Sequence, residues 1–240
     1  MRSGINWASG LVERRQSKMR RIMILNSKGG CGKSTISTNL AGYFATQGIE
    51  TRLLDFDPQQ SSIEWLQMRP EGRPKIRGLS ANIDQIMVPN HKGVMIIDTP
   101  AGMRGKELKS YVRQAHTIII PVLPSPIDMR ATARFIESVL LLGRVDKKKV
   151  RLAVVANRVR KQTRIYQGLR RFLDSLGIPF IAVLRESQNY IRAVDQGLSI
   201  FEGAPSKVEE DLAQWKPIIK WLKSSDSRPA RKKKRAEETN

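Results

Sequence analysis

Residues 26–35 read NSKGGCGKST, a glycine-rich stretch with one lysine at Lys28 and a second at Lys33. The stretch follows a short apolar run, Arg21–Asn26, and precedes an amphipathic segment that extends to Gln47. A strand, a glycine-rich turn and a helix in this order form a P-loop, whose backbone N–H groups bind phosphate. The stretch therefore predicts a nucleotide-binding domain, with ATP as the expected ligand.

The P-loop assigns roles to its side chains. Lys33 is expected to reach the β and γ phosphates, and the Ser34 hydroxyl is expected to bind Mg²⁺. Ser27 stands where the general pattern GxxxxGK[ST] has its first glycine, so the match is to a variant of the motif. The other residues expected to surround the nucleotide are Gly29, Gly30, Cys31, Gly32 and Thr35.

Short apolar runs recur along the chain and alternate with amphipathic stretches. Runs that are apolar on both faces and separated by helices are typical of a parallel sheet covered on both sides. The predicted fold class is therefore α/β: a mostly parallel, doubly wound sheet of the P-loop NTPase type, with helices on both faces. The predicted strands are Arg21–Asn26, Thr51–Phe56, Val94–Asp98, His116–Val122, Val150–Ala156 and Phe180–Leu184.

Three aspartates end predicted strands. Asp55 and Asp57 lie in LLDFDPQQ (53–60), and Asp98 ends the apolar run VMIID (94–98). An unpaired buried carboxylate is costly, and a metal ion removes that cost. We therefore expect these aspartates, with Ser34, to surround Mg²⁺. Each of the three could instead cap the helix that follows it.

Together these motifs resemble the ParA/MinD family of P-loop ATPases, whose signature is KGGxGK[ST]. The signature here is Lys28–Ser34, and DFDPQQ, IIDTPAG and PVLPSPIDM (121–129) resemble further family segments. The resemblance covers about residues 20–222. It implies a homodimer that traps two ATP molecules, with Lys28 crossing to the nucleotide of the partner. It also implies that Asp57 activates water, supported by Asp55, and that Asn157 binds adenine, although Asn157 could be a helix cap.

The chain is strongly basic, with 43 Lys and Arg against 22 Asp and Glu and a formal net charge of +21. Such an excess predicts binding to a polyanion. Between Gly143 and Arg192 there are thirteen basic and three acidic residues, which favours sequence-independent contact with DNA phosphates. The residues expected to contact DNA are Arg158, Arg160, Lys161, Arg164, Arg170, Arg171 and Arg192.

The ends of the chain differ from its centre in composition. Residues 1–19 are predicted to be a flexible extension, 20–223 the ATPase domain, and 224–240 a disordered basic tail that includes RKKKR (231–235). Val208–Leu222 is amphipathic and begins with three acids. It is expected to pack on the sheet, since an anionic lipid surface disfavours acids; a membrane anchor is the alternative.

Other classes of protein are disfavoured. No apolar run approaches the roughly 20 residues of a membrane span, and Cys31 alone supports neither a disulfide framework nor a nitrogenase-type iron–sulfur cluster. The sequence predicts a cytoplasmic, nucleoid-associated ParA-type ATPase without an N-terminal DNA-reading domain. Its dimer would coat DNA. An activator, either a ParB-like protein or a cargo adaptor, would stimulate the slow hydrolysis of ATP, and the dimer would then release the DNA. The alternative is a MinD-like positioning ATPase on a membrane.

Overall fold

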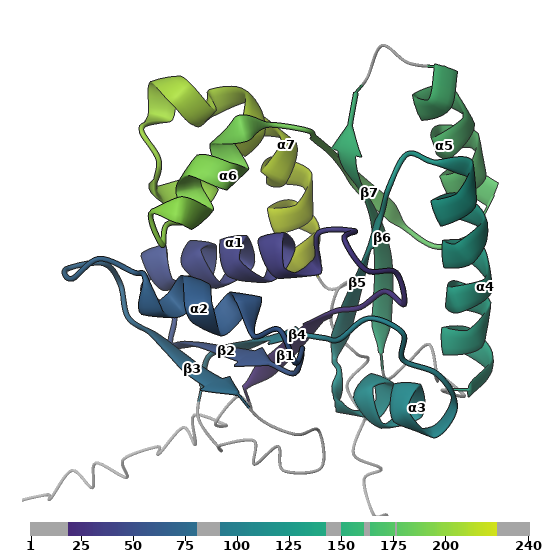
Figure 1. Cartoon of the computed structure of the whole chain (residues 1–240), viewed down its shortest axis with the longest axis horizontal. Helices are drawn as coiled ribbons and strands as arrows, with labels where there is room; N and C mark the ends of the chain where they lie inside the picture. Colours follow the sequence, from purple (N-terminus) through teal and green to yellow (C-terminus); the bar gives the residue numbers. More distant parts are fainter. Residues whose placement is uncertain (1–18, 81–91, 143–149, 161–163, 176, 225–240) are drawn as a thin grey trace, which may run out of the picture.

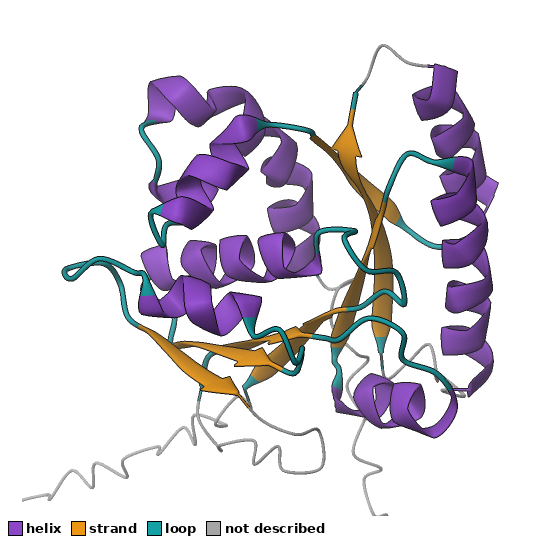
Figure 2. Cartoon of the chain, in the orientation of Figure 1, coloured by secondary structure: helices purple, strands orange, loops and turns teal. Residues whose placement is uncertain are grey.

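A computed structural model describes residues 19–80, 92–142, 150–160, 164–175 and 177–224. The described strands form one parallel sheet in the order β3-β2-β4-β1-β5-β6-β7 (Figures 1 and 2). The predicted fold class is confirmed. The strands are β1 Arg20–Ile24, β2 Thr51–Asp55, β3 Ile76–Ser80, β4 Val94–Asp98, β5 Thr117–Val122, β6 Arg151–Val159 and β7 Phe180–Arg185.

The helices cover the sheet on both faces, so each face has its own apolar core. Helices α1, α2, α6 and α7 pack on one face, and α3, α4 and α5 on the other (Figure 1). Their bounds are α1 Lys33–Thr46, α2 Ser61–Gln67, α3 Gly105–Gln114, α4 Pro126–Leu142, α5 Arg164–Ser175, α6 Gln188–Asp195 and α7 Pro205–Lys223, with a short 3-10 turn, η2, at Ile200–Glu202.

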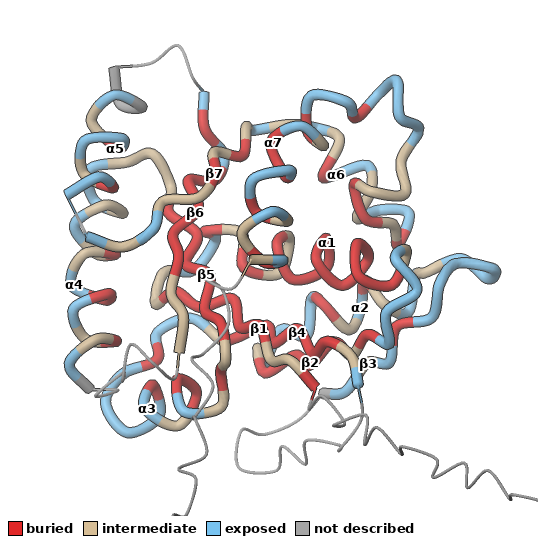
Figure 3. The backbone as a smooth tube through the Cα atoms, turned by 180° about the vertical axis from the view of Figure 1, so that it is seen from behind, coloured by how far each residue is buried: buried red, intermediate tan, exposed pale blue. Residues whose placement is uncertain are grey.

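The central strands are buried on both faces, as their continuous apolar sequence requires (Figure 3). Because side chains alternate along a strand, Ile22 and Ile24 enter the core beneath α1, whereas Met23 enters the core beneath α3 and α4. All strands are parallel, so their carboxyl ends meet at one edge, where the P-loop and Asp98 lie.

Two strands differ from the sequence prediction by more than two residues, whereas the bounds of the others agree within two. β3 was not predicted, because this edge strand (IRGLS) is short and contains Arg77 and Gly78 among its apolar residues. β6 continues to Val159, three residues beyond the predicted end, through a register irregularity between Ala156 and Val159. Such an irregularity bends a strand and redirects its side chains.

Helix α7 is packed against the sheet, as the sequence predicted. Its buried positions include Val208, Trp215, Ile218 and Leu222, all within the core that α1 shares. Among the helices in the described ranges, none is both long and apolar enough to cross a bilayer. The two predicted terminal segments, apart from residue 19 and Ser224, lie outside the described residues.

A buried carboxylate fixes α7 to the end of β7. Asp211 accepts hydrogen bonds from Arg185 (Nε–Oδ1 2.7 Å, Nη2–Oδ2 3.1 Å), from Asn189 (2.7 Å) and from Ser187 (3.3 Å). Burial alone would raise the pKa of Asp211, but the bonds from Arg185 and Asn189 hold it below its ordinary value. The ionised carboxylate therefore stabilises the fold above the ordinary aspartate pKa, and this contribution is lost as the pH falls through the lowered pKa.

Asp211→Ala should lower the free energy of unfolding by about 2–4 kcal/mol at pH 7, because it leaves the partly buried Arg185 without this partner. Urea unfolding measures the effect. Glu209→Ala, an exposed substitution on the same helix, is the control and should change stability by less than about 0.5 kcal/mol. Equal losses in the two variants would show that the buried network does not fix α7.

Candidate nucleotide-binding site

The P-loop joins β1 to α1 and borders a pocket of about 620 Å³. Gly30 and Gly32 have positive φ angles of 70° and 92°, which turn the chain so that Gly32 caps the N-terminus of α1. The residues of the loop that line this pocket are Gly29, Gly30, Gly32, Lys33, Ser34 and Thr35. Cys31 is buried beneath the loop, so its predicted contact with nucleotide could come only from its backbone.

Lys33 is 94% buried, as its exposed fraction of 6% shows. Its Nζ donates to the carbonyl oxygen of Lys28 at 3.2 Å, and the Cys31 thiol donates to the same oxygen at 3.2 Å. Both bonds hold the loop in a closed turn at the N-terminus of α1. The ammonium of Lys33 is thus already positioned inside the loop where phosphate would bind.

Lys28 is oriented differently from Lys33. Its side chain is 40% exposed and its Nζ lies 3.6 Å from Oδ1 of Asp128, at the start of α4. The Asp128 backbone N–H is bonded in turn to the Ser125 hydroxyl at 3.1 Å. Lys28 does not line the phosphate pocket; it lines a second pocket, which shares no lining residue with the first. In this conformation Lys28 is therefore directed away from the nucleotide site of its own subunit.

Asn26 anchors the loop to the rest of the sheet edge. Its Oδ1 accepts the backbone N–H of Lys28 at 3.1 Å, and its Nδ2 donates to the carbonyl of Pro121 at the end of β5 at 2.7 Å. Sequence reasoning assigned no role to Asn26 or to Asp128. Both lie inside motifs quoted for other reasons, and their contacts join segments about a hundred residues apart.

Asp98 has the chemistry of a metal ligand. Its Oδ2 accepts the Ser62 hydroxyl at 2.6 Å, whereas its buried Oδ1 has no hydrogen-bond partner. Burial raises the pKa of Asp98 to about 6, against the opposing effects of Ser62, Ser34 and Lys33. A cation would satisfy this oxygen, so Asp98 and the Ser34 hydroxyl fit the predicted Mg²⁺.

Asp55 and Asp57 follow the same strand end but have different surroundings. Both oxygens of Asp55 accept backbone N–H groups, Oδ1 from Asp57 at 2.9 Å and Oδ2 from Ser62 at 2.8 Å and Ile63 at 3.3 Å. This geometry favours the capping role for Asp55 at the start of α2 over the metal role. Asp57 lines the phosphate pocket. Among the described residues, no three or more His, Cys, Asp or Glu side chains gather into a metal cluster.

Asn157 lies within β6 and is no helix cap. It is buried, and its Nδ2 donates to the carbonyl of Cys31 in the P-loop at 2.8 Å. Asn157 and Thr35 also line a neighbouring pocket of about 350 Å³ that continues toward α6. The contact of Asn157 with adenine stays a prediction. Arg158, which is predicted to contact DNA, lines both pockets and has a φ of +52°.

The residues predicted to contact DNA are spread over several elements. Helices α5 and α6, which carry most of them, lie on opposite faces of the sheet (Figure 1). Arg160 pairs with Glu186 at 2.7 Å, and both side chains are exposed. Lys161 is outside the described residues, and Arg164 begins α5. The remaining exposed candidates are Arg170 and Arg171 on α5 and Arg192 on α6.

Gly32→Ala should disrupt the site. A Cβ at Gly32 would lie 2.1 Å from Nδ2 of Asn157, at a φ of +92°, so Asn157 must move and the backbone is strained. We expect ATP affinity to fall at least tenfold, measured by calorimetry. Gly48→Ala is the matched control, because its φ of +69° strains the backbone in the same way, a Cβ there meets nothing within 4 Å, and Gly48 does not line the pocket; it should change affinity less than threefold. Similar losses in both would refute the role of the contact between Gly32 and Asn157.

Comparison with known proteins identifies the family. The family model described as "CobQ/CobB/MinD/ParA nucleotide binding domain" matches residues 22–200. The chain belongs to the ParA/MinD family. A relative in Halothiobacillus neapolitanus, "Maintenance of carboxysome distribution protein A", is 30% identical over 189 residues, which are 75% of this chain and 86% of the relative. "Protein ParA" of Rhizobium radiobacter is 26% identical over 67% of this chain and 75% of its own length.

Solved structures of family members show the same fold. "Structure of Cyanthece apo McdA" superposes with a TM-score of 0.69 at 16% identity, covering 84% of this chain and 99% of that one. "MinD cell division protein, Aquifex aeolicus" superposes with a TM-score of 0.67 at 20% identity, covering 88% and 100%. The P-loop and the family membership together make this a nucleotide-binding protein of the ParA/MinD type.

Proposed function

We propose that this chain is a ParA-type positioning ATPase. Two subunits bind ATP and Mg²⁺ and close face to face, the dimer binds nucleoid DNA without sequence preference, and hydrolysis stimulated by a partner protein releases it. The observation that carries this proposal is the opposite orientation of the two loop lysines. Lys33 is buried inside the loop, whereas Lys28 is partly exposed and directed away from the phosphate pocket of its own subunit.

Lys28 is therefore available to a nucleotide in a second subunit. A cation at a water-poor interface between two triphosphates offsets their repulsion, so ATP would hold the dimer together. ADP lacks the γ-phosphate and would hold it less well. The ion pair between Lys28 and Asp128 must open first, but an exposed pair of this kind contributes only about 0–1 kcal/mol.

Within one subunit the roles follow the geometry. Lys33 and the loop N–H groups orient the phosphates, and Asp57 at the edge of the same pocket positions the attacking water. Ser34 and Asp98 would hold Mg²⁺, which neutralises charge on the phosphates when it is bound. Because this catalysis is mostly positioning, an unstimulated dimer would hydrolyse ATP slowly.

The net charge of +21 supports DNA as the surface on which the dimer rests. Closure brings two basic surfaces together, so DNA affinity would depend on ATP. A membrane is disfavoured because the apolar face of α7 is buried in the core. Two relatives are named for the maintenance of carboxysome distribution, which favours a cargo of that kind over a plasmid or chromosome.

Binding to random duplex DNA with ATP, ADP or no nucleotide, over a series of salt concentrations, tests the proposal. We expect binding that requires ATP and weakens steeply with salt, because each phosphate contact releases counterions. Binding that is equal in all three nucleotide states would refute the coupling. Sedimentation with anionic liposomes and ATP, but not with DNA, would favour the membrane alternative.

A further inference from the structure

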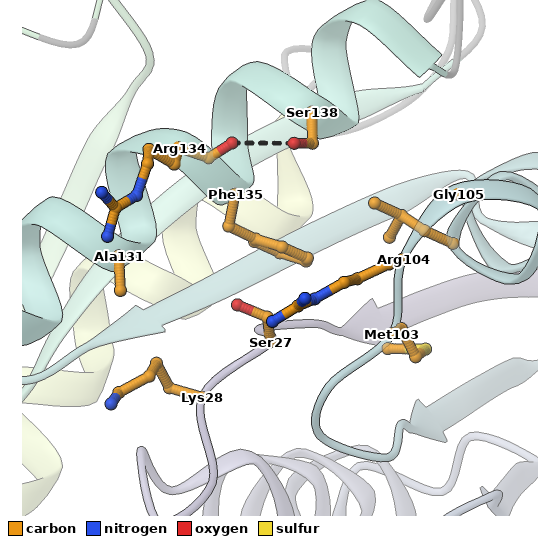
Figure 4. A pocket seen from close by; sticks show the side chains of 10 residues that line it. Ser27, Lys28, Met103, Arg104, Gly105, Ala131, Arg134, Phe135 and Ser138 are labelled. Carbon is orange, nitrogen blue, oxygen red and sulfur yellow. Dashed lines mark hydrogen bonds between the residues drawn. The ribbon is translucent and has the colours of Figure 1, made fainter.

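A second pocket, of about 390 Å³, borders the start of the phosphate loop (Figure 4). Its walls are the start of the P-loop, the segment that joins β4 to α3, and α4. It shares no lining residue with the phosphate pocket. The lining residues that matter for its chemistry are Lys28, Met103, Arg104, Leu108, Arg134 and Phe135.

The pocket has an apolar floor. Met103 and Leu108 are each 1% exposed and Phe135 is 5% exposed, and all three belong to the core beneath α3 and α4. Figure 4 shows the ring of Phe135 directed from α4 toward the side chain of Arg104. A hollow with a floor of this kind suits an inserted apolar side chain better than the phosphate backbone of DNA, whose contacts need no apolar floor.

The rim of the pocket is positive. Lys28, Arg104 and Arg134 line it, and no acid is among the lining residues. Lys28 is paired with Asp128, but no carboxylate in the described part of the chain forms an ion pair with Arg104 or Arg134. Both arginines are exposed, so their guanidinium groups can form bidentate pairs with carboxylates of another molecule.

The walls of the pocket are connected to the nucleotide site. The backbone N–H of Gly102 donates to the carbonyl of Ser27 at 2.8 Å, which joins the segment after Asp98 to the start of the P-loop. Two walls are therefore extensions of the segments that would bind phosphate and metal. A ligand in this pocket would therefore contact segments that continue into the candidate nucleotide site.

We propose that this pocket binds an acidic segment of a partner protein. One apolar side chain of that segment enters against Met103, Leu108 and Phe135, and carboxylates beside it pair with Arg104 and Arg134. Arginine around an apolar centre is the usual composition of such an interface. The proposed contacts are made by Arg104, Arg134 and the apolar floor and not by Lys28, so peptide binding to the ADP-bound subunit tests this site separately from the proposed function.

Selection of random 12-residue peptides displayed on phage, against the full chain with ADP, tests the proposal. We expect the enriched peptides to carry Asp or Glu on both sides of a Leu, Ile, Met or Phe. A synthetic copy of the most enriched peptide, labelled with a fluorophore, is then titrated by anisotropy. Its affinity for the Arg104→Ser/Arg134→Ser variant should fall at least tenfold, because two charge-assisted contacts are lost.

Lys109→Ser/Arg113→Ser is the matched control. It removes the same charge from exposed positions of α3 that do not line the pocket, and it should change affinity by less than about twofold, as expected for rim charges screened by salt. Urea unfolding confirms that both variants are folded. Three results would each overturn the proposal: no enriched peptide, enriched peptides without acids, or equal loss in the control. Loss of DNA affinity in Arg104→Ser/Arg134→Ser, with peptide binding unchanged, would assign the arginines to DNA instead.

Discussion

Lys28→Ala should lower the affinity for DNA in the presence of ATP at least a hundredfold, while ATP binding to the single subunit changes little. The first effect is large because the variant loses a cation that would pair with phosphate across a buried interface. The second is small because Lys28 does not line its own phosphate pocket. DNA titration and calorimetry of ATP binding measure these two quantities, and light scattering with ATP measures dimerisation on the same preparation.

The control for Lys28→Ala is Lys216→Ala, which removes one positive charge from an exposed position on α7. It should weaken DNA binding by less than about threefold, as a single screened charge would. If both variants lose DNA affinity equally, the effect of Lys28 is one of net charge. If Lys28→Ala loses ATP affinity as well, Lys28 acts within its own subunit and the proposed dimer contact is wrong.

Much of the fold followed from local patterns in the sequence. Continuous apolar runs such as Val94–Asp98 predict buried parallel strands, and the structure places that strand at the same bounds. The P-loop was predictable because its function depends on a local turn, with glycine required where φ is positive, as at Gly32. The edge strand β3 was missed because a half-exposed strand has no continuous apolar signal.

The contacts between distant segments were not predictable in the same way. Asp128 meets Lys28 and Asn26 meets Pro121 only after the sheet has formed. Likewise, the sequence placed Asp55, Asp57 and Asp98 at strand ends but could not distinguish a cap from a metal ligand. That distinction depends on which oxygens already have backbone partners, as both oxygens of Asp55 do.

Asp98→Asn should have two effects of opposite sign. Without nucleotide, the buried carboxyl has a pKa raised by burial from 3.8 to about 6. Its neutral form is favoured in the folded protein, so its contribution to stability is present below pH 4 and is lost as the pH rises through 6. The asparagine variant avoids that loss, so at pH 8 it should be more stable than the wild type by up to about 3 kcal/mol, and the difference should vanish at pH 4.

With MgATP the order should reverse. Ligand at a hundred times its Kd stabilises the wild type by about 2.7 kcal/mol, and the variant should lose most of this gain because an amide lacks the charge that Mg²⁺ requires. Adding EDTA should remove the same gain from the wild type.

Asp55→Asn, at the position paired with Asp98 in the sheet, is the control. Burial raises the pKa of Asp55 as well, but both of its oxygens accept backbone N–H groups, which an amide nitrogen cannot do. Asp55→Asn should therefore be destabilised at pH 8. A loss of stability in Asp98→Asn without nucleotide would show that the unpartnered oxygen of Asp98 is satisfied within the subunit, and the metal assignment would fail with it.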